Sequence, residues 1–281
     1  MSIFLDIFIS SVFYDNPLLL LSMLFIFFGR MLPIIALSPF LGSRVLPHPV
    51  KIALALSLFT IFLPRLLTVT TIPPNFNFIL LMYVIKEMFI GIILGTLMSL
   101  PFIIAQSAGM LIDHQRGGAS LQVNDPTIQN QSSPLGTLFN MSLVYIFFLI
   151  DGPFLFLDAI MTSYELIPPD KFFNPAFFAR DSLSWHASIK LFNQVMIMSV
   201  QLATPALIAI LMTDSFLGLA NRLAPQVQIT FLGMPLKSLL GLTVVCLGYK
   251  LMVKQMISDS HYWLNAIAEY ISMFGIGTTS I

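Results

Sequence analysis

Two adjacent ionisable residues, Lys86 and Glu87, stand inside a long apolar stretch of the sequence. Charged groups in such surroundings are functional candidates, because an unpaired charge is costly to bury. A lysine and a glutamate placed in this way could relay protons in a transporter, or they could form structural ion pairs. Neighbouring residues on a helix do not face each other, so we expect each of the two to find its own partner on another helix or subunit. We favour the structural ion pairs.

Three aspartates, Asp151, Asp158 and Asp214, lie at the ends of apolar stretches or inside them, where an intramembrane protease could keep a catalytic pair. No glycine-x-glycine-aspartate signature accompanies them. The sequence also lacks an H-E-x-x-H zinc helix, a G-x-S-x-G nucleophile elbow and a P-loop lysine motif. The four histidines are scattered, and the one cysteine, Cys246, excludes a disulfide framework and a cysteine-rich metal site. We therefore predict no enzyme, no metal and no cofactor.

The composition indicates a protein that lies in a membrane or in a membrane complex. Of the 281 residues, 57% are hydrophobic and only 9% are charged, whereas soluble domains carry about 25% charged residues. The formal net charge of zero argues against a nucleic-acid surface. The first residues carry no lysine or arginine, so we expect no cleaved signal peptide and a first apolar segment that stays on the mature protein.

The long apolar stretches are rich in helix formers and lack strict alternation, so we predict an all-α fold. Several of them are poor bilayer spans. Gly29 and Arg30 interrupt the first, Pro64 ends the second, and Pro101 and Pro205 interrupt the third and the fifth. The numbers of lysine and arginine residues expected on the two sides of the membrane barely differ, so the positive-inside rule does not decide the topology. We expect bent, broken helical hairpins packed into a protein assembly. The six main segments are Pro17–Leu41, Val50–Leu67, Phe78–Ala108, Pro134–Met161, Ile189–Leu219 and Phe231–Met256.

Three sequence blocks, in this order, carry a resemblance to a known family. They are "KEMFIGIILGTLMSLPFIIAQSAGMLIDHQRGGAS" at 86–120, "QSSPLG" at 131–136 and "NRLAPQVQITFLGMPLKSLLG" at 221–241. The stretch "GRMLPIIALSPFLGSRVLPHPVKIALAL" at 29–56 adds to them. Together they resemble the FliR/SctT family of type III secretion export proteins over nearly the whole chain. The "DHQRGG" motif is more similar to the injectisome branch of the family than to the flagellar branch. The chain departs from the usual pattern at "ASLQVNDPTIQN".

The resemblance implies a non-enzymatic export-gate subunit in the bacterial inner membrane, within the base of a secretion system. One copy would close a helical ring formed with two small export proteins, and unfolded secreted proteins would pass through its centre. The resemblance also implies contact with the large multi-pass export protein and with lipid. Energy would come from a separate ATPase and from the proton-motive force. A flagellar export subunit and a small-molecule secondary transporter with broken helices are the alternatives, although we find no internal symmetry of the kind that transporters show.

The polar stretch between the third and fourth apolar segments is implied by the resemblance to be a channel plug. Glycines there allow backbone turns at Gly109, Gly117 and Gly118. Asp113 and Arg116 can pair if the helix continues to Gly117, or Arg116 could donate to carbonyls of a neighbouring subunit. An ordinary exposed linker is the alternative. The plug residues that we predict are Asp113, Gln115, Arg116, Gly117, Gly118, Pro126, Ser133, Pro134 and Gly136.

Two further groups of residues receive predicted roles. "GIILG" at 91–95 is a small-xxx-small pattern that lets another helix approach closely. We assign helix packing and buried charge to Arg30, Lys86, Glu87, Gly91 and Gly95. The second group forms the tip of a helical hairpin, where we expect contact with the large export protein, or else with lipid headgroups. Its residues are Arg222, Pro225, Gln226, Pro235 and Lys237, and Pro235 should lie near the first turn of the returning helix.

The predicted organisation is a single export-apparatus domain with four parts. N-terminal helical hairpins occupy about 1–108, the polar plug-like loop 109–134, C-terminal helical hairpins 135–257 and an amphipathic tail 258–281. The apolar residues of the tail recur at helical spacing, so we expect a short helix lying on a membrane or on a partner.

Overall fold

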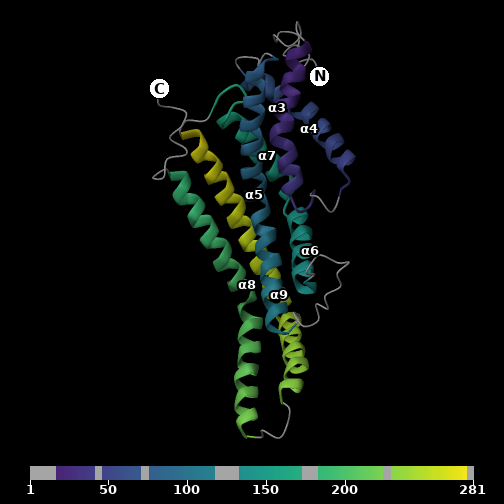
Figure 1. Ribbon diagram of the computed structural model, residues 1–281, viewed down its shortest axis with the longest axis vertical. Coiled ribbons are helices and arrows are strands. Elements are labelled where there is room, and N and C mark those ends of the chain that lie inside the picture. The colour runs from purple at the N-terminus through teal and green to yellow at the C-terminus, as the bar shows by residue number, and fades with distance from the viewer. Residues whose placement is uncertain are drawn as a thin grey trace. The chain divides into compact units, whose positions relative to one another are not determined.

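A computed structural model of the chain describes residues 17–41, 46–70, 76–117, 133–172, 183–223 and 229–276. All regular secondary structure in these ranges is α-helical (Figure 1), which confirms the predicted fold class. The helices of the described residues are α3 (Pro17–Leu37), α4 (His48–Val69), α5 (Phe78–Gln115), α6 (Pro134–Leu149), α7 (Gly152–Leu166), α8 (Leu183–Leu223) and α9 (Ile229–Ile276).

Several helices are long and apolar enough to cross a membrane. Among the described residues, five stretches qualify: Leu18–Leu37, His48–Val69, Phe78–Gln115, His186–Leu223 and Gly233–Trp263. Helices α6 and α7 make a sixth candidate if they count as one span, and they are bent by 77° relative to each other. The expectation of broken segments is thus met most clearly in the fourth apolar stretch, which is two helices.

The bend between α6 and α7 has a local cause at residues 150–153. Helix α6 ends with the Ile150 N–H donating to the Ile146 carbonyl. Asp151 then takes a left-handed conformation with φ of 57°, a region that aspartate and asparagine enter more readily than most other L residues. Pro153 occupies the first turn of α7, where its missing N–H costs nothing. The chain therefore changes direction here and starts a new helix.

Five of the expected interruptions do not end their helices. Helix α3 continues through Gly29 and Arg30, α4 through Pro64, α5 through Pro101 and α8 through Pro205. A glycine inside a helix costs only about 1 kcal/mol and a proline about 3 kcal/mol, so tertiary packing can outweigh either. Arg30 is fully buried with its charge paired, which removes the reason for the helix to stop there.

The chain divides into two compact units, each assembled from separate pieces of sequence. Unit 1 comprises Met1–Ser99, Asp151–Ile189 and Leu264–Ile281, and unit 2 comprises Leu100–Ile150 and Lys190–Trp263. Helices α5, α8 and α9 each contribute to both units. The four parts predicted from the sequence are, in contrast, continuous segments that follow one another along the chain.

The core of unit 1 is aromatic and lies where α3, α4 and α7 meet. Phe27 of α3 packs against Phe59 and Phe62 of α4 at ring-centroid distances of 5.4 and 5.9 Å. It also stacks on Tyr164 of α7 at 5.9 Å. Phe40, beyond the end of α3, meets Phe156 of α7 edge-on. Because these side chains are large and close-packed, they fix α7 against the first two helices.

Unit 2 holds the α8–α9 hairpin, whose two long helices lie side by side in Figure 1. The Trp263 indole N–H of α9 points at the Met198 sulfur of α8 at 3.1 Å. Helix α6 joins this unit through Phe147, which meets Phe102 of α5, and through Ser142, whose hydroxyl lies 2.6 Å from the Tyr249 hydroxyl of α9. Helix α6 is therefore in contact with both α5 and α9 within unit 2.

Two predicted boundaries differ from the structure. Helix α5 continues to Gln115, so the polar loop begins after that residue and not at 109. Helix α9 runs without a break through 258, so the described part of the predicted tail is the end of a 48-residue helix. Both helices have partners at these positions, and such contacts hold a helix together past the point where its apolar pattern weakens.

Candidate functional site

The two ends of the polar loop meet at one carboxylate, that of Asp113 on α5. Its Oδ2 atom accepts hydrogen bonds from the Ser133 hydroxyl at 2.5 Å and from the Leu135 backbone N–H at 3.0 Å. Ser133 is the N-cap of α6, and its hydroxyl in turn accepts from the Gly136 N–H at 2.9 Å. Residues 113 and 133 are thus joined directly, and a negative charge sits at the positive end of a helix, where it is stabilising.

The other oxygen of Asp113 binds Arg116, as the spacing of the two residues predicted. Oδ1 accepts from Nε of Arg116 at 2.7 Å and lies 2.7 Å from its Nη2. The remaining arm of the guanidinium, Nη1, donates to the Ser238 hydroxyl of α9 at 3.3 Å. Arg116 therefore connects the end of α5 to the α8–α9 hairpin. A planar fork with several donors can bind two partners at once in this way.

Close backbone contact between α5 and α6 depends on two glycines. A Cβ atom on Gly109 would lie 2.4 Å from the Gly136 nitrogen, and one on Gly136 would lie 2.9 Å from the Gln106 carbonyl oxygen. Gly109 is therefore a helix-packing residue and not a turn residue, which corrects the prediction. Gly117 does take a turn conformation, with φ of +88°, as expected.

The remaining predicted plug residues have mixed outcomes. Gln115 is exposed at the last residue of α5, and Pro134 is exposed at the first residue of α6. Gly118 and Pro126 lie outside the described residues. What the structure brings together is the base of the loop, from Asp113 to Gly117 on one side and from Ser133 to Gly136 on the other.

A second group of charged residues is buried in unit 1, around Arg30. The Arg30 guanidinium donates to both carboxylate oxygens of Glu87, through Nε and, at 2.9 Å, through Nη2. It also donates to the Ser163 hydroxyl at 3.0 Å and to the Ile167 carbonyl at 2.9 Å. Tyr164 covers its face at 3.9 Å from the ring centroid. The arginine thus ties α3 to α5 and to the end of α7.

Lys86 and Glu87 each have the separate partner that we expected. The Lys86 ammonium donates to the backbone carbonyls of Pro168, Pro169 and Lys171, at 3.1, 3.2 and 2.8 Å. It also lies 2.7 Å from Oε1 of Glu87, which the expectation that neighbours do not face each other had excluded. The flexible four-carbon stem of lysine lets its ammonium group reach the buried carboxylate of the next residue, which Arg30 also binds.

The predicted small-xxx-small contact between helices is present. A Cβ atom on Gly91 would lie 2.3 Å from the Arg30 carbonyl oxygen, and one on Gly95 would lie 3.1 Å from Cα of Ile34. The two glycines therefore let α5 approach the backbone of α3 closely enough for Arg30 to reach Glu87. The packing and the ion pair are parts of one arrangement.

The predicted hairpin tip is described only in part, because Pro225 and Gln226 lie outside the described residues. Arg222 is exposed in the last turn of α8. Lys237 of α9 forms an ion pair with Asp214 of α8, one of the three aspartates considered above for the catalytic pair of an intramembrane protease. Pro235 lies inside α9 and not near its first turn, because the helix already begins at Ile229.

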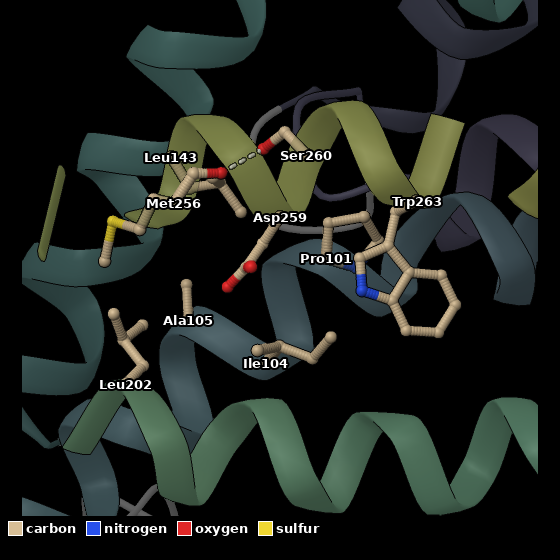
Figure 2. A pocket seen from close by; sticks show the side chains of 9 residues that line it. All are labelled: Pro101, Ile104, Ala105, Leu143, Leu202, Met256, Asp259, Ser260 and Trp263. Atoms are coloured by element: carbon tan, nitrogen blue, oxygen red, sulfur yellow. Dashed lines mark hydrogen bonds between the residues drawn. The ribbon is translucent and has the colours of Figure 1, made fainter. Parts of the chain in front are cut away.

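Unit 2 also contains a small cavity beside Pro101, lined by residues of α5, α6, α8 and α9 (Figure 2). Asp259 extends into it from α9 and accepts a hydrogen bond from the Gln255 amide at 2.8 Å. The neighbouring Ser260 hydroxyl is occupied by the Met256 carbonyl at 2.7 Å. The other lining side chains are mostly apolar, and the described residues hold no group of three metal-ligating side chains. The cavity does not resemble a catalytic centre.

Sequence reasoning missed three participants, Ser163, Tyr164 and Ser238. The first two lie more than 130 positions from Arg30, and no spacing rule connects them. Ser238 follows Lys237 in a block that we had singled out, but a serine on an apolar helix ordinarily bonds to its own backbone. Only the fold shows that its hydroxyl faces Arg116.

Comparisons with known proteins cover most of the chain. Residues 21–261 match the family described as "Bacterial export proteins, family 1". The chain is 34% identical over 175 residues to Yop proteins translocation protein T of Yersinia pestis. That match covers 60% of this chain and 65% of the Yersinia protein, slightly less than two thirds of its length.

Two other relatives match over longer stretches. Surface presentation of antigens protein SpaR of Salmonella typhimurium is 28% identical over 222 residues, covering 79% of this chain and 81% of that protein. Flagellar biosynthetic protein FliR of Escherichia coli is 28% identical over 216 residues, covering 77% of this chain and 80% of that protein. Similarity therefore extends to proteins named for translocation and for surface presentation of antigens, and to a protein named for flagellar biosynthesis.

Proposed function

Because this chain belongs to family 1 of the bacterial export proteins, the FliR/SctT family, we propose that it is a non-enzymatic subunit of a type III protein export gate. The family match covers residues 21–261, which include every described residue of the loop base and of the buried charge cluster. Five helices long and apolar enough to cross a membrane support a place in the bacterial inner membrane. The subunit would serve the passage of unfolded proteins through the membrane.

We favour an injectisome over a flagellum. Two proteins named for secretion or translocation are 34% and 31% identical to the chain, whereas the Escherichia coli flagellar protein is 28% identical. The "DHQRGG" stretch supports the same choice. Since SpaR of Salmonella typhimurium is also 28% identical, the flagellar export subunit remains the alternative. The genes beside this one would decide between the two.

The proposed plug rests on one observation, the shared carboxylate of Asp113. It binds Arg116 through one oxygen and the first residues of α6 through the other, so both ends of the loop 118–132 start from one fixed point. A loop tethered at a single point can fill a pore and still move as a unit.

The buried cluster around Arg30 has a structural role in this proposal. Each cation faces a carboxylate or backbone carbonyls, and the guanidinium lies inside unit 1 with none of its surface exposed. A proton relay needs access to water or to a chain of polar groups. The cluster would instead hold α3, α5 and the end of α7 in the shape that the partner subunits require. Those partners are two small ring-forming export proteins and the large multi-pass export protein.

Deletion of residues 117–129 tests the plug. The variant should still co-purify with the two small ring-forming proteins in mild detergent, and the host membrane should become permeable to ions. Measurement of the potassium efflux and of the membrane potential gives the readout. Normal assembly with an unchanged ion leak would exclude the plug. Recovery of the chain alone, from cells that contain the ring-forming proteins, would contradict the gate subunit itself.

A further inference from the structure

The second half of helix α9 carries two lysines that have no ion-pair partner among the described residues. Lys250 and Lys254 lie one turn apart on the same side of the helix, and both are exposed. The ion pairs of the described residues involve other cations, namely Arg30, Arg65, Lys86, Arg116 and Lys237. Within the described part of the chain, the two positive charges are therefore uncompensated.

These lysines lie at a level of unit 2 where the neighbouring helix is uncharged. Helix α9 meets α8 at the Lys237–Asp214 ion pair, and again where the Trp263 indole contacts Met198. Lys250 and Lys254 lie between these two contacts. The charge-free stretch of α8 runs from 191 to 213. It is about 35 Å of helix, enough to cross a hydrocarbon core of about 30 Å. The two lysines therefore lie within the depth at which unit 2 can cross a membrane.

Hydrocarbon is a poor neighbour for this side of α9. A charged side chain in the apolar core of a bilayer is costly, and such residues ordinarily face protein or water. A lysine at the end of a span can extend its ammonium group to the headgroups, but these two lie between the contacts with α8. Among the five candidate spans of the described residues, Gly233–Trp263 is both the least apolar and the least buried. A helix that meets only lipid needs the opposite combination.

Open water is also a poor neighbour, because large apolar side chains flank the lysines. Leu247 and Leu251 lie on the same side of α9 and are 81% and 72% exposed. We call Leu247, Lys250, Leu251 and Lys254 the basic patch. A surface that combines exposed apolar side chains with charges is typical of a protein interface, because burial of the first gives affinity and the second select the partner. Two lysines select carboxylates.

We propose that the basic patch is the docking surface for a helix of another export subunit that carries aspartate or glutamate at matching positions. Lys250 and Lys254 are four residues apart, which is about 6 Å along the helix. Two carboxylates one turn apart on a partner helix can therefore pair with both lysines at once, while the leucines pack against apolar residues of the same helix. This inference rests on the proposed function, because it needs a gate that is built from several subunits.

A carbodiimide cross-link tests the contact directly, because this reagent condenses an amine with a carboxylate that touches it and adds no spacer. In the assembled complex in mild detergent, Nζ of Lys250 or Lys254 should form an amide bond with an aspartate or glutamate of a co-purifying export subunit. Mass spectrometry identifies the pair. Lys250→Arg with Lys254→Arg keeps the charges, so it should keep the complex and lose these cross-links. Lys190, which is exposed near the start of α8, should instead react with a water-soluble amine reagent.

Substitutions of both lysines test what the charges contribute. Lys250→Glu with Lys254→Glu should lower the amount of co-purifying subunit about tenfold or more, because repulsion replaces attraction at a buried contact. Lys190→Glu is the matched control, since it makes the same change of charge at another exposed lysine of unit 2 and should have little effect. Lys250→Leu with Lys254→Leu should also lower recovery, because it leaves the carboxylates of the partner unpaired.

The outcomes separate the inference from the function on which it rests. Full recovery of the complex with both lysines changed to leucine would assign the basic patch to lipid and overturn the inference. Reaction of Lys250 and Lys254 with the amine reagent as fast as Lys190, without cross-links, would assign the patch to water and overturn it as well. Recovery of the unaltered chain without any other export subunit would contradict the proposed function itself.

Discussion

Glu87 lies between two cations in the core of unit 1, where Arg30 binds both of its oxygens and Lys86 binds one of them. Arg30 and Glu87 are 57 positions apart and neither side chain is exposed. Removal of one partner from a buried ion pair costs about 3–5 kcal/mol, because the remaining charge loses its compensation. Substitutions of the individual cluster residues should therefore lower the stability of the protein by different, measurable amounts.

Glu87→Gln should be more destabilising than Arg30→Met. The first leaves two like charges without a carboxylate, whereas the second leaves Glu87 with Lys86. We expect a loss of about 3–5 kcal/mol for Glu87→Gln, seen as a lower temperature at which the purified complex loses its tertiary structure. Arg65→Ala is the control, because its partner Glu165 is exposed and such surface pairs contribute about 0–1 kcal/mol. Equal effects of Glu87→Gln and Arg65→Ala would contradict the central role of Glu87.

Gly91→Ala should prevent the close approach of α3 and α5. Its new Cβ atom would lie 2.3 Å from the Arg30 carbonyl oxygen, which belongs to the backbone and cannot move aside cheaply. We expect a marked loss of assembled complex on a gel under native conditions. Gly248→Ala is the matched control, because nothing lies within 4 Å of its Cβ position. That change should be neutral, or stabilising by up to about 1 kcal/mol, since alanine favours a helix.

Lys86→Met should lower the recovery of the assembled complex, because the buried Pro169 carbonyl loses its donor and Glu87 loses one of its two cations. An unsatisfied buried carbonyl costs about 1–3 kcal/mol. Lys190→Met on the exposed face of α8 should leave recovery unchanged. A different pattern, with normal recovery and lost dependence of secretion on the proton gradient, would support the proton relay that we consider the weaker interpretation.

Asp113→Ala should open the loop base without unfolding the chain. It removes the acceptor of Arg116, of the Ser133 hydroxyl and of the Leu135 N–H at once. We expect a larger ion leak than the unaltered chain gives, with the complex still assembled. Asp158→Ala serves as the control because Asp158 is exposed on α7. A leak no greater than that of Asp158→Ala would remove the support for a tethered plug.

The sequence predicts that the helices exist, but it does not predict correctly where several of them end. All six apolar segments are helical, and the family suggested by the "DHQRGG" and "MPLK" blocks is confirmed by the match over residues 21–261. The prediction that Gly29, Arg30, Pro64, Pro101 and Pro205 interrupt or end their segments is wrong, because each lies inside a continuous helix. The local propensity of glycine and proline opposes a helix, but packing against other helices outweighs it, and that packing has no local signal in the sequence.

The candidate site was predictable where its partners are close in sequence. The Asp113–Arg116 pair follows from a spacing of three on a helix, and it is present. The bonds of Asp113 to Ser133 and of Arg116 to Ser238 span 20 and 122 positions. No periodicity connects such residues. The roles of the plug and of the hairpin tip stay predictions, because Gly118, Pro126, Pro225 and Gln226 lie outside the described residues.

The division of unit 1 into three pieces of sequence has a consequence for how the protein is made. Its first two pieces, Met1–Ser99 and Asp151–Ile189, are separated in the sequence by Leu100–Ile150, which belongs to unit 2. The Arg30–Glu87 pair lies within the first piece, but Ser163 and the Ile167 carbonyl, which also bind Arg30, lie in the second. The two units therefore cannot mature one after the other during translation, as domains made of continuous segments do. The guanidinium of Arg30 acquires its full set of partners only after part of unit 2 has been synthesised.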